Sequence, residues 1–278
     1  MNLLNYFNKK RELSPNNRKE YHLNEHGYVD LGNQFIDSSD LANKYEKCDF
    51  SKSSFAHSNR IYWIENRMFI NSIFYKTIFR ALAEHGNEFY SCLFEDINFK
   101  NAIIGYDSSC YVNCTFKKVK FGAFIKPQFR DCKFINCDFY DVDFQASNFE
   151  NCRGGFPTES LKKEFGYAKQ NKMLNVSFED AILHDVTFSD NCDLSTVLFP
   201  KQGMYLFFDN WNEQLDMIMN EGATNQSKTI KNDIVSFVEI HKVHSTNQKY
   251  YILNVVDLLK EYNDKTVEII TKKATQKI

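Results

Sequence analysis

The cysteine and histidine pairs are the residues of this sequence whose spacing could hold a metal ion. Cys110 and Cys114 lie four residues apart, and cysteines at such spacing bind zinc when two further ligands are close. No second cysteine pair and no neighbouring histidine completes that site. His22 and His26 have Glu25 between them, but this order differs from the His-Glu-x-x-His helix of zinc proteases. The sequence therefore predicts no bound metal.

Acid–base chemistry has equally little support. Asp141 and Asp143 are close in sequence, but general acid–base catalysis needs such groups to meet in a cleft. His241 and His244 fall at the end of a predicted helix, where a solvated histidine is common. The sequence contains no glycine-rich phosphate loop and no Gly-x-Ser-x-Gly elbow. We expect no catalytic residue, no cofactor and no enzymatic activity.

The elements that would position any site follow from an internal repeat. Phenylalanine occurs 26 times and recurs at steps of five residues through the middle of the chain. A period of five fits neither an amphipathic helix, with 3.6 residues per turn, nor a flat strand, with a period of two. It requires a backbone that turns a corner after every five residues. The predicted ladder of core rings comprises Phe94, Phe99, Phe116, Phe121, Phe129, Phe134, Phe139, Phe144, Phe149, Phe178 and Phe188.

The residue two positions before each ring gives an independent check. This position holds small or β-branched side chains almost throughout, and the residues between are mainly polar. One large and one small inward residue in every five describe a narrow tube with a dry interior. Of the eight cysteines, only Cys110 does not occupy the small position, so a packing role explains the others. With this placement and no secretory signal, we expect reduced thiols in a cytoplasmic protein.

This pattern resembles that of the pentapeptide-repeat family, in which a small residue and any residue precede a central Leu or Phe that two polar residues follow. The segments Cys-Asp-Phe-Tyr-Asp, Val-Asp-Phe-Gln-Ala and Ser-Asn-Phe-Glu-Asn, which together span residues 137–151, carry the resemblance. It implies an all-β fold, a right-handed quadrilateral β-helix over roughly residues 34–199, in which four pentapeptides complete one coil. Residues twenty apart would then stack, so that Phe149 neighbours Phe129 and Cys152 neighbours Cys132.

Two interruptions break the repeat, near residues 57–67 and 154–172, and residues 104–111 suggest a bulge. Loops of a solenoid carry function more often than its core. Helical spacing of apolar residues after Thr158 predicts a short helix in the second interruption. This helix either shields the flank of the coil or projects as a recognition element. The candidate recognition residues are Phe156, Leu161, Lys162, Lys163, Phe165 and Tyr167.

The two ends of the chain lack the repeat. Residues 1–33 are polar and suggest a loosely ordered arm or an N-terminal cap. Residues 200–278 predict a mainly helical extension. Its apolar stripes occupy residues 209–221, 228–241 and 249–262, and residues 266–270 fit either a strand or a fourth helix. Solenoids need caps, but this extension is larger than a cap requires. Partner binding and a homodimer through this region are therefore further expectations.

Charge is unevenly distributed, although the net charge is only −2. The candidate acidic interaction face comprises Asp138, Asp141, Asp143, Glu150, Glu179, Asp180, Asp185, Asp190 and Asp193. By the resemblance, some pentapeptide-repeat proteins use such acidic rows to mimic duplex DNA and to occupy a type II topoisomerase. Those mimics are more acidic overall, and Lys117, Lys118 and Lys120 interrupt the row here. An ordinary solvated face is the other interpretation.

We therefore interpret the chain as a non-enzymatic scaffold that presents the faces and loops of a β-helix to a protein partner. One alternative is a DNA mimic that protects or inhibits gyrase. Another is a small effector or enzymatic module in the C-terminal region, which a deep pocket with converging polar groups would support. No apolar run long enough to span a membrane occurs, and the low net charge argues against direct binding to nucleic acid or lipid. The Asn, Lys and Phe bias is typical of an AT-rich, bacterial genome.

Overall fold

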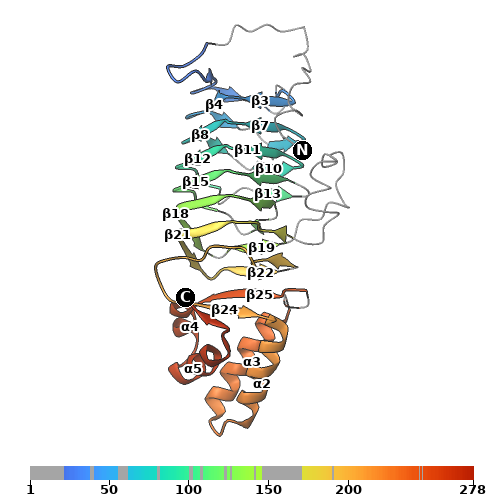
Figure 1. Ribbon diagram of the computed structural model, residues 1–278, viewed down its shortest axis with the longest axis vertical. Helices are drawn as coiled ribbons and strands as arrows, with labels where there is room; N and C mark the ends of the chain where they lie inside the picture. The colour runs from blue at the N-terminus through green and yellow to red at the C-terminus, as the bar shows by residue number, and fades with distance from the viewer. Residues whose placement is uncertain are drawn as a thin grey trace.

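The chain forms a long parallel coil followed by an α/β domain (Figure 1). The computed structural model describes residues 22–37, 41–55, 62–79, 82–99, 103–106, 109–121, 124–125, 127–140, 142–145, 171–189, 191–243, 245 and 247–278. Parallel strands from successive turns pair along the coil on all of its walls. The predicted four-sided β-helix with a helical C-terminal extension is therefore confirmed.

Four walls of parallel strands make up the coil, and the chain passes through them in a fixed order. The first wall contains β1 (Val29–Asp30), β4 (Cys48–Asp49), β8 (Ile73–Tyr75), β12 (Leu93–Glu95), β15 (Thr115–Lys117) and the first halves of β18 (Lys133–Tyr140) and β21 (Ser177–His184). The second wall contains β2 (Phe35–Ile36), β5 (Ser54–Phe55) and β9 (Ile78–Phe79), and the second halves of β18 and β21 continue it.

The third and fourth walls complete each turn. The third wall contains β6 (Tyr62–Glu65), β10 (Leu82–His85), β13 (Ile103–Tyr106), β16 (Phe124–Ile125), β19 (Asp143–Gln145) and β22 (Thr187–Ser189). The fourth wall contains β3 (Lys44–Glu46), β7 (Met68–Ile70), β11 (Glu88–Tyr90), β14 (Cys110–Val112) and β17 (Gln128–Arg130), and then β20 (Asn171–Lys172) and β23 (Cys192–Asp193). The C-terminal domain follows directly below the last turn (Figure 1).

Stacked aromatic rings fill the interior of the coil. On the first wall, neighbouring ring centroids lie 4.8–5.1 Å apart along Phe50, Phe74, Phe94, Phe116, Phe134 and Phe178. This spacing matches the separation of about 4.8 Å between hydrogen-bonded strands. The described phenylalanines of the predicted ladder are at most 3% exposed, and Phe149 lies outside the described residues. Each ring is therefore buried mainly by the rings of the turns above and below it.

Several of the small inward positions hold cysteine thiols that bond to the preceding turn. The Sγ of Cys92 donates to the Phe69 carbonyl at 3.4 Å, and the Sγ of Cys114 donates to the Phe89 carbonyl at 3.4 Å. The described cysteines are all free and buried. Burial raises the pKa of the Cys137 thiol to about 12, so this thiol remains protonated and unreactive at neutral pH.

The corners of the coil explain why the sequence contains only 10 glycines and 4 prolines. Corner residues adopt positive φ angles, and most of them are asparagine, aspartate or lysine rather than glycine. Asparagine and aspartate tolerate this region because their short polar side chains bond locally. At one corner the Asn113 amide donates to Ser91 at 3.0 Å, and the Asn175 amide donates to Asp131 at 2.9 Å. Polar ladders thus hold the corners together on the outside.

The interruptions differ from the sequence prediction. Residues 62–65 form β6 and pair in register with β10, so the interruption expected over 57–67 does not extend through its second half. The predicted stacking of Phe149 on Phe129 is also wrong, because the Leu174 amide donates to the Phe129 carbonyl at 3.1 Å. After β19, the coil therefore continues on the fourth wall at Asn171. Met173 and Val176 occupy the inward positions where Phe149 and Cys152 were expected. Phe149 and Cys152 themselves lie outside the described residues.

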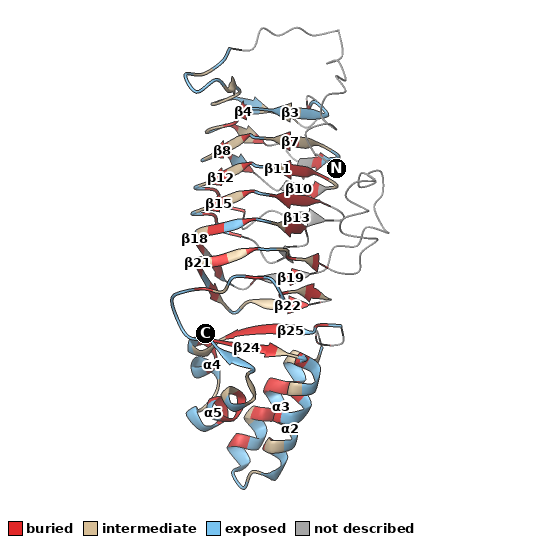
Figure 2. Cartoon of the chain, viewed as in Figure 1, coloured by how far each residue is buried: buried red, intermediate tan, exposed pale blue. Residues whose placement is uncertain are grey.

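The C-terminal domain packs helices against a small antiparallel sheet. The sheet has the order β25 (Tyr250–Asn254), β24 (Tyr205–Asp209) and β26 (Gln276–Lys277). The helices are α2 (Trp211–Thr224), α3 (Lys228–Lys242), α4 (Val255–Glu261) and α5 (Asp264–Lys273). Buried stripes of α2 and α3 face the domain interior, and their polar sides face solvent (Figure 2). Gly222 allows the close approach of these helices, since a Cβ there would lie 2.5 Å from the Ile234 side chain.

One helical prediction for this domain needs correction. The segment 249–262 is a strand followed by a short helix, because aromatic and β-branched residues form β25 before the Asn254 side chain caps α4 by accepting from the Val256 amide. Of the two structures left open for residues 266–270, the helix is confirmed, because these residues lie within α5. The strand β24 was not predicted. Within the part of the chain that the structure describes, no helix is long and apolar enough to cross a membrane.

Candidate functional site at the junction of coil and C-terminal domain

The last turn of the coil ends in strand edges that side chains of the C-terminal domain cover. Gln248 Oε1 accepts from the Cys192 amide at 2.8 Å, and its Nε2 donates to the Cys192 carbonyl at 2.8 Å. On the second wall, Tyr205 Oη accepts from the backbone amide of Leu183 at 3.2 Å. The side-chain Nδ2 of Asn254 donates to the Leu183 carbonyl at 2.7 Å. Side chains thus provide the hydrogen bonds that a further strand would make.

Asp257 fastens α4 to the same turn. Its carboxylate accepts from the Asp185 backbone amide at 2.9 Å and from Lys260 Nζ at 2.8 Å. It also lies 3.2 Å from His184 Nδ1. Because Asp257 is only 8% exposed, its charge depends on these partners for solvation. Through these three contacts, Asp257 stabilises the packing of α4 against the last turn of the coil.

The pKa values of the two junction carboxylates, Asp257 and Asp185, are shifted in opposite directions. Burial opposes ionisation of Asp257, but the hydrogen bonds from Lys260, from the Asp185 amide and from His184 outweigh it, so the pKa of Asp257 is lowered. Burial and the negative charge of Asp257 raise the pKa of Asp185, and Glu261 adds to this effect. Asp257 and Glu261 therefore place negative charge near Asp185, which Lys260 and His184 partly offset.

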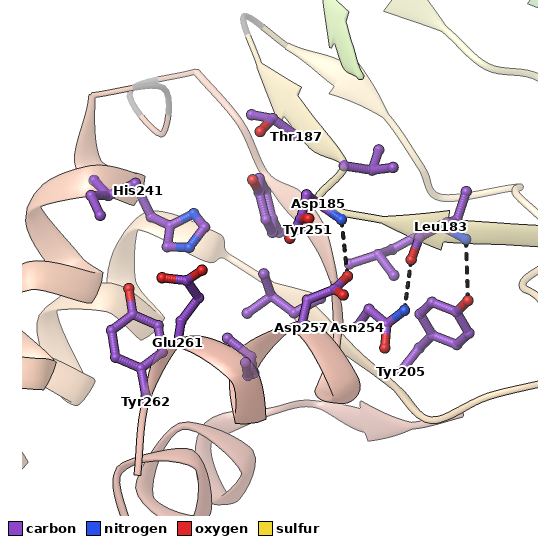
Figure 3. Close-up of a pocket in the computed structure, with 15 residues that line it drawn as sticks. Leu183, Asp185, Thr187, Tyr205, His241, Tyr251, Asn254, Asp257, Glu261 and Tyr262 are labelled. Atoms are coloured by element: carbon purple, nitrogen blue, oxygen red, sulfur yellow. Dashed lines mark hydrogen bonds between the residues drawn. The ribbon is translucent and has the colours of Figure 1, made fainter. Parts of the chain in front are cut away.

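A cavity of about 230 Å³ lies at this junction, where the third wall ends (Figure 3). The terminal strand of that wall is β22, and Thr187 of β22 lines the cavity. The buried rings of Tyr205 and Tyr251 form part of its interior, and Asp185 and Glu261 lie at its solvent-exposed rim. No lysine or arginine is among the described residues that line it. This arrangement offers carboxylate acceptors and aromatic neighbours to a bound group.

The structure spreads the candidate acidic residues over several walls. Glu179 lies on the first wall and pairs with Lys201 at 2.7 Å. Asp193 lies on the fourth wall, where it accepts from the Ser195 amide. Asp138 lies on the second wall and Asp143 on the third, Asp180 lies within β21, and Asp185 directly follows β21. The described members thus do not form a single row, and Asp141, Glu150 and Asp190 lie outside the described residues.

The remaining candidates divide between described and undescribed parts of the chain. Phe156, Leu161, Lys162, Lys163, Phe165 and Tyr167 all lie outside the described residues, as does the helix predicted after Thr158. Cys114 lies in the main core, whereas Cys110 packs with Val112 in a separate small cluster. Across the described ranges, no group of three or more histidine, cysteine or carboxylate side chains could hold a metal ion. His241 lines the junction cavity.

Sequence reasoning missed a buried carboxylate inside the coil. Glu84 is 2% exposed, and it accepts a hydrogen bond from Tyr111 Oη at 2.9 Å. Tyr111 takes a position in the ladder, with its ring stacked 4.6 Å from that of Phe89. Burial and the nearby Glu84 raise the pKa of Tyr111 well above its ordinary value. A tyrosine at a phenylalanine position was the signal that could have found this pair.

The junction residues were missed for a different reason. Asn254 and Asp257 sit in the segment 249–262, which the sequence presents as one amphipathic helix, and Gln248 directly precedes it. Their partners lie more than fifty residues away in the coil. Local periodicity contains no information on contacts of this range.

Comparisons with known proteins agree with the repeat. The family model described as pentapeptide repeats (8 copies) matches residues 128–153. Comparison with curated proteins gives no match. Among solved structures, a trypsin-treated variant of QnrB1, a plasmid-mediated fluoroquinolone resistance protein, is 13% identical and overlaps 56% of this chain and 87% of its own, with a TM-score of 0.23. Full-length QnrB1 is 13% identical, with 56% and 90% covered and a TM-score of 0.22.

These structural overlaps are too loose to carry an argument about function. The five-residue sequence period, the four-walled parallel coil and the family match bear on identity instead. Together they show that this chain contains pentapeptide repeats and folds as a four-sided parallel β-helix.

Proposed function

We propose that the chain is a non-enzymatic scaffold that binds a protein partner on the outside of its coil and C-terminal domain. The filled interior carries this proposal. Ring centroids on the first wall follow one another at 4.8–5.1 Å, which leaves no room for a substrate between them. Recognition must therefore use outer side chains. Free buried thiols support a reducing compartment such as the cytoplasm.

The apolar surface next to the junction is the best candidate for partner contact. Tyr140 is 62% exposed, Ile182 is 42% exposed and Val256 is 43% exposed. Tyr140 pairs in register with His184, whose side chain contacts Asp257, the neighbour of Val256. Exposed apolar side chains that lie close together mark protein interaction sites. We define Tyr140, Ile182 and Val256 as the junction patch.

A capture experiment with point variants tests this proposal. The intact chain serves as bait in a cell lysate, beside a variant with Tyr140→Ser, Ile182→Thr and Val256→Thr. A matched control carries Ile78→Thr and Met217→Thr, since these side chains are similarly exposed, at 47% and 49%, outside the junction patch. A specific protein retained by the intact chain and the control but lost by the patch variant is the expected result. Retention of no specific protein by the intact chain would contradict the scaffold proposal.

The topoisomerase alternative has a clear readout in the same experiment. The described acidic residues lie on separate walls, and basic partners neutralise several, as Lys117 does for Glu95 at 2.8 Å and Lys201 does for Glu179. This charge pattern does not favour a DNA mimic. Recovery of gyrase or topoisomerase subunits, together with a dose-dependent change in supercoiling by purified gyrase, would nevertheless establish that alternative.

A further inference from the structure

The junction cavity has a structural cause in the way the last turn is capped. On the first wall the Phe178 amide donates to the Leu198 carbonyl at 2.8 Å. On the second and fourth walls, Leu183 and Cys192 are covered by the side chains described above. The third wall instead ends at β22, with the cavity beside it and α3, β25 and α4 around it. The cavity thus lies between the end of the third wall and the elements of the C-terminal domain that pack around it.

The cavity has the dimensions of a single side chain or a small ion. Its volume of about 230 Å³ exceeds the roughly 150 Å³ of an engineered cavity that accepts benzene. It is smaller than the roughly 300–1,000 Å³ of pockets that hold drug-sized ligands. The group that enters must therefore be compact, and it must pass a rim at which Asp185, Glu261 and Ile240 are exposed to solvent.

The chemistry of the lining favours a positive charge on an apolar stem. Asp185, Asp257 and Glu261 all line the cavity (Figure 3), and only Asp257 has a described lysine partner, Lys260. The ring of Tyr251 is 2% exposed, and one of its faces is stacked on Trp211 with centroids 4.5 Å apart. Tyr262 lies beside Glu261 (Figure 3). Aromatic faces attract cations, and more strongly where water is excluded. Apolar neighbours such as Ile240 suit an alkyl stem.

We propose that this cavity binds an alkyl ammonium or guanidinium group, with Asp185 and Glu261 as its counter-charges. Two sources share that chemistry: a lysine or arginine side chain of the protein partner, and a free small amine. The inference rests on the proposed scaffold function only for the first source. Burial and the negative charge of Asp257 raise the pKa of Asp185, although the nearby Lys260 opposes this effect. A cation in the cavity would add a favourable interaction with the ionised form of Asp185.

Titration of the intact chain with small probes tests the cavity without any partner. The probes are butylamine, Nα-acetyl-lysine amide and Nα-acetyl-arginine amide, and butanol serves as the neutral analogue. The readout is the methyl NMR signals of Ile240 and Ile252, which both line the cavity. We expect saturable shifts with the cations and much weaker binding of butanol. Tighter binding of the amino-acid amides than of butylamine identifies a partner side chain as the source, and the reverse order identifies a free amine.

Matched variants make the result specific to the two carboxylates. The variant Asp185→Asn with Glu261→Gln should weaken cation binding about tenfold, because two partly exposed ion pairs are lost. The control Asp180→Asn with Glu213→Gln removes the same charge from exposed sites that do not line the cavity, and it should bind like the parent. Unchanged affinity in the first variant, equal binding of butanol, or no shift with any cation would overturn the proposal. A failure here leaves the scaffold proposal to be decided by partner capture alone.

Discussion

At the scale of single residues, the Glu84–Tyr111 pair is one of the places where the described interior of the coil is polar. Both side chains are 2% exposed, so each polar atom must be satisfied inside the coil. We expect Tyr111→Phe to lower the free energy of unfolding by about 1–3 kcal/mol, although phenylalanine is the usual ladder residue. The loss comes from Glu84, which forfeits one hydrogen bond while it remains buried. Urea denaturation measures it.

A double-mutant cycle separates this effect from altered ring packing. In a Glu84→Leu background, Tyr111→Phe should cost much less, because the carboxylate that needed the hydroxyl is gone. Equal costs of Tyr111→Phe in both backgrounds would show that the hydroxyl and the carboxylate are not coupled.

Asp257 and Asp185 should respond to neutralisation with opposite signs. Asp257→Asn removes charge-assisted hydrogen bonds and should cost about 1–3 kcal/mol of stability at pH 7. Asp185→Asn should stabilise by a fraction of a kcal/mol, since this exposed group is screened by solvent. Asparagine also suits its φ of 48°. Thermal denaturation of the two variants at pH 7 measures both effects.

The pH dependence of the Asp257 contribution follows from its lowered pKa. A carboxyl group with a lowered pKa in the folded state stabilises the fold above its unfolded pKa of about 3.9. That stabilisation disappears as the pH falls through the folded pKa. The gap in stability between the parent and Asp257→Asn should therefore narrow below about pH 4. A gap that stays constant down to pH 2 would mean that the charge of Asp257 is not what holds the junction.

At the scale of elements, Gln248 substitutes for a missing strand at the end of the fourth wall. Gln248→Ala leaves the buried Cys192 amide and carbonyl without their partners, at an expected cost of about 1–3 kcal/mol for each group. Gln248→Glu should cost less, because one oxygen can still accept from the amide. Faster hydrogen exchange of the Cys192 amide in the alanine variant reports the exposed edge directly. Gln276→Ala, at an exposed position of β26, is the control, and an equal effect there would contradict this role.

Some of the elements could be predicted from the sequence, and others could not. The walls were predictable because Phe129, Phe134 and Phe139 repeat a local pattern that only a regular corner satisfies. The residue that stacks on Phe129 in the following turn could not be predicted, since Phe149 fits the pattern as well as Met173. Which of the two takes this position depends on pairing across 44 residues. The strand β25 was missed because its pairing with β24 overrides the helical periodicity of residues 249–262. Gln248, which directly precedes that segment, was missed because its partner Cys192 is distant in sequence.

At the scale of the whole molecule, the apolar stripes of the C-terminal domain are used within the domain itself. Leu215 and Ile218 of α2, Ile234 and Phe237 of α3, and Ile270 of α5 are all 0% exposed. The surplus apolar surface that suggested a homodimer is therefore absent from these stripes. We expect light scattering to give the mass of a monomer, 32.7 kDa, at micromolar concentrations. A stable dimer would show that exposed side chains such as Val243, 72% exposed, form an interface.

The continuity of the core predicts that coil and C-terminal domain unfold together. One hydrophobic cluster contains Phe139 of the coil and Phe237 of α3, each 0% exposed. Phe188 of the last turn contacts Tyr251 of β25, with ring centroids 6.1 Å apart. Phe139→Ala and Phe237→Ala should each cost about 3–5 kcal/mol. Both should shift a single transition, because each part covers apolar surface of the other.

A background with Trp63→Phe makes this test sharp, since it leaves Trp211 of α2 as the only tryptophan. Trp211 fluorescence then reports the C-terminal domain, and circular dichroism reports mainly the strands of the coil. We expect the two urea curves to coincide in the parent and in both alanine variants. Tyr140→Ala, next to Phe139 but 62% exposed, should change stability by only about 0.5 kcal/mol. If Phe237→Ala shifts the fluorescence curve alone, the C-terminal domain folds independently, and the junction contacts join two domains without coupling their stability.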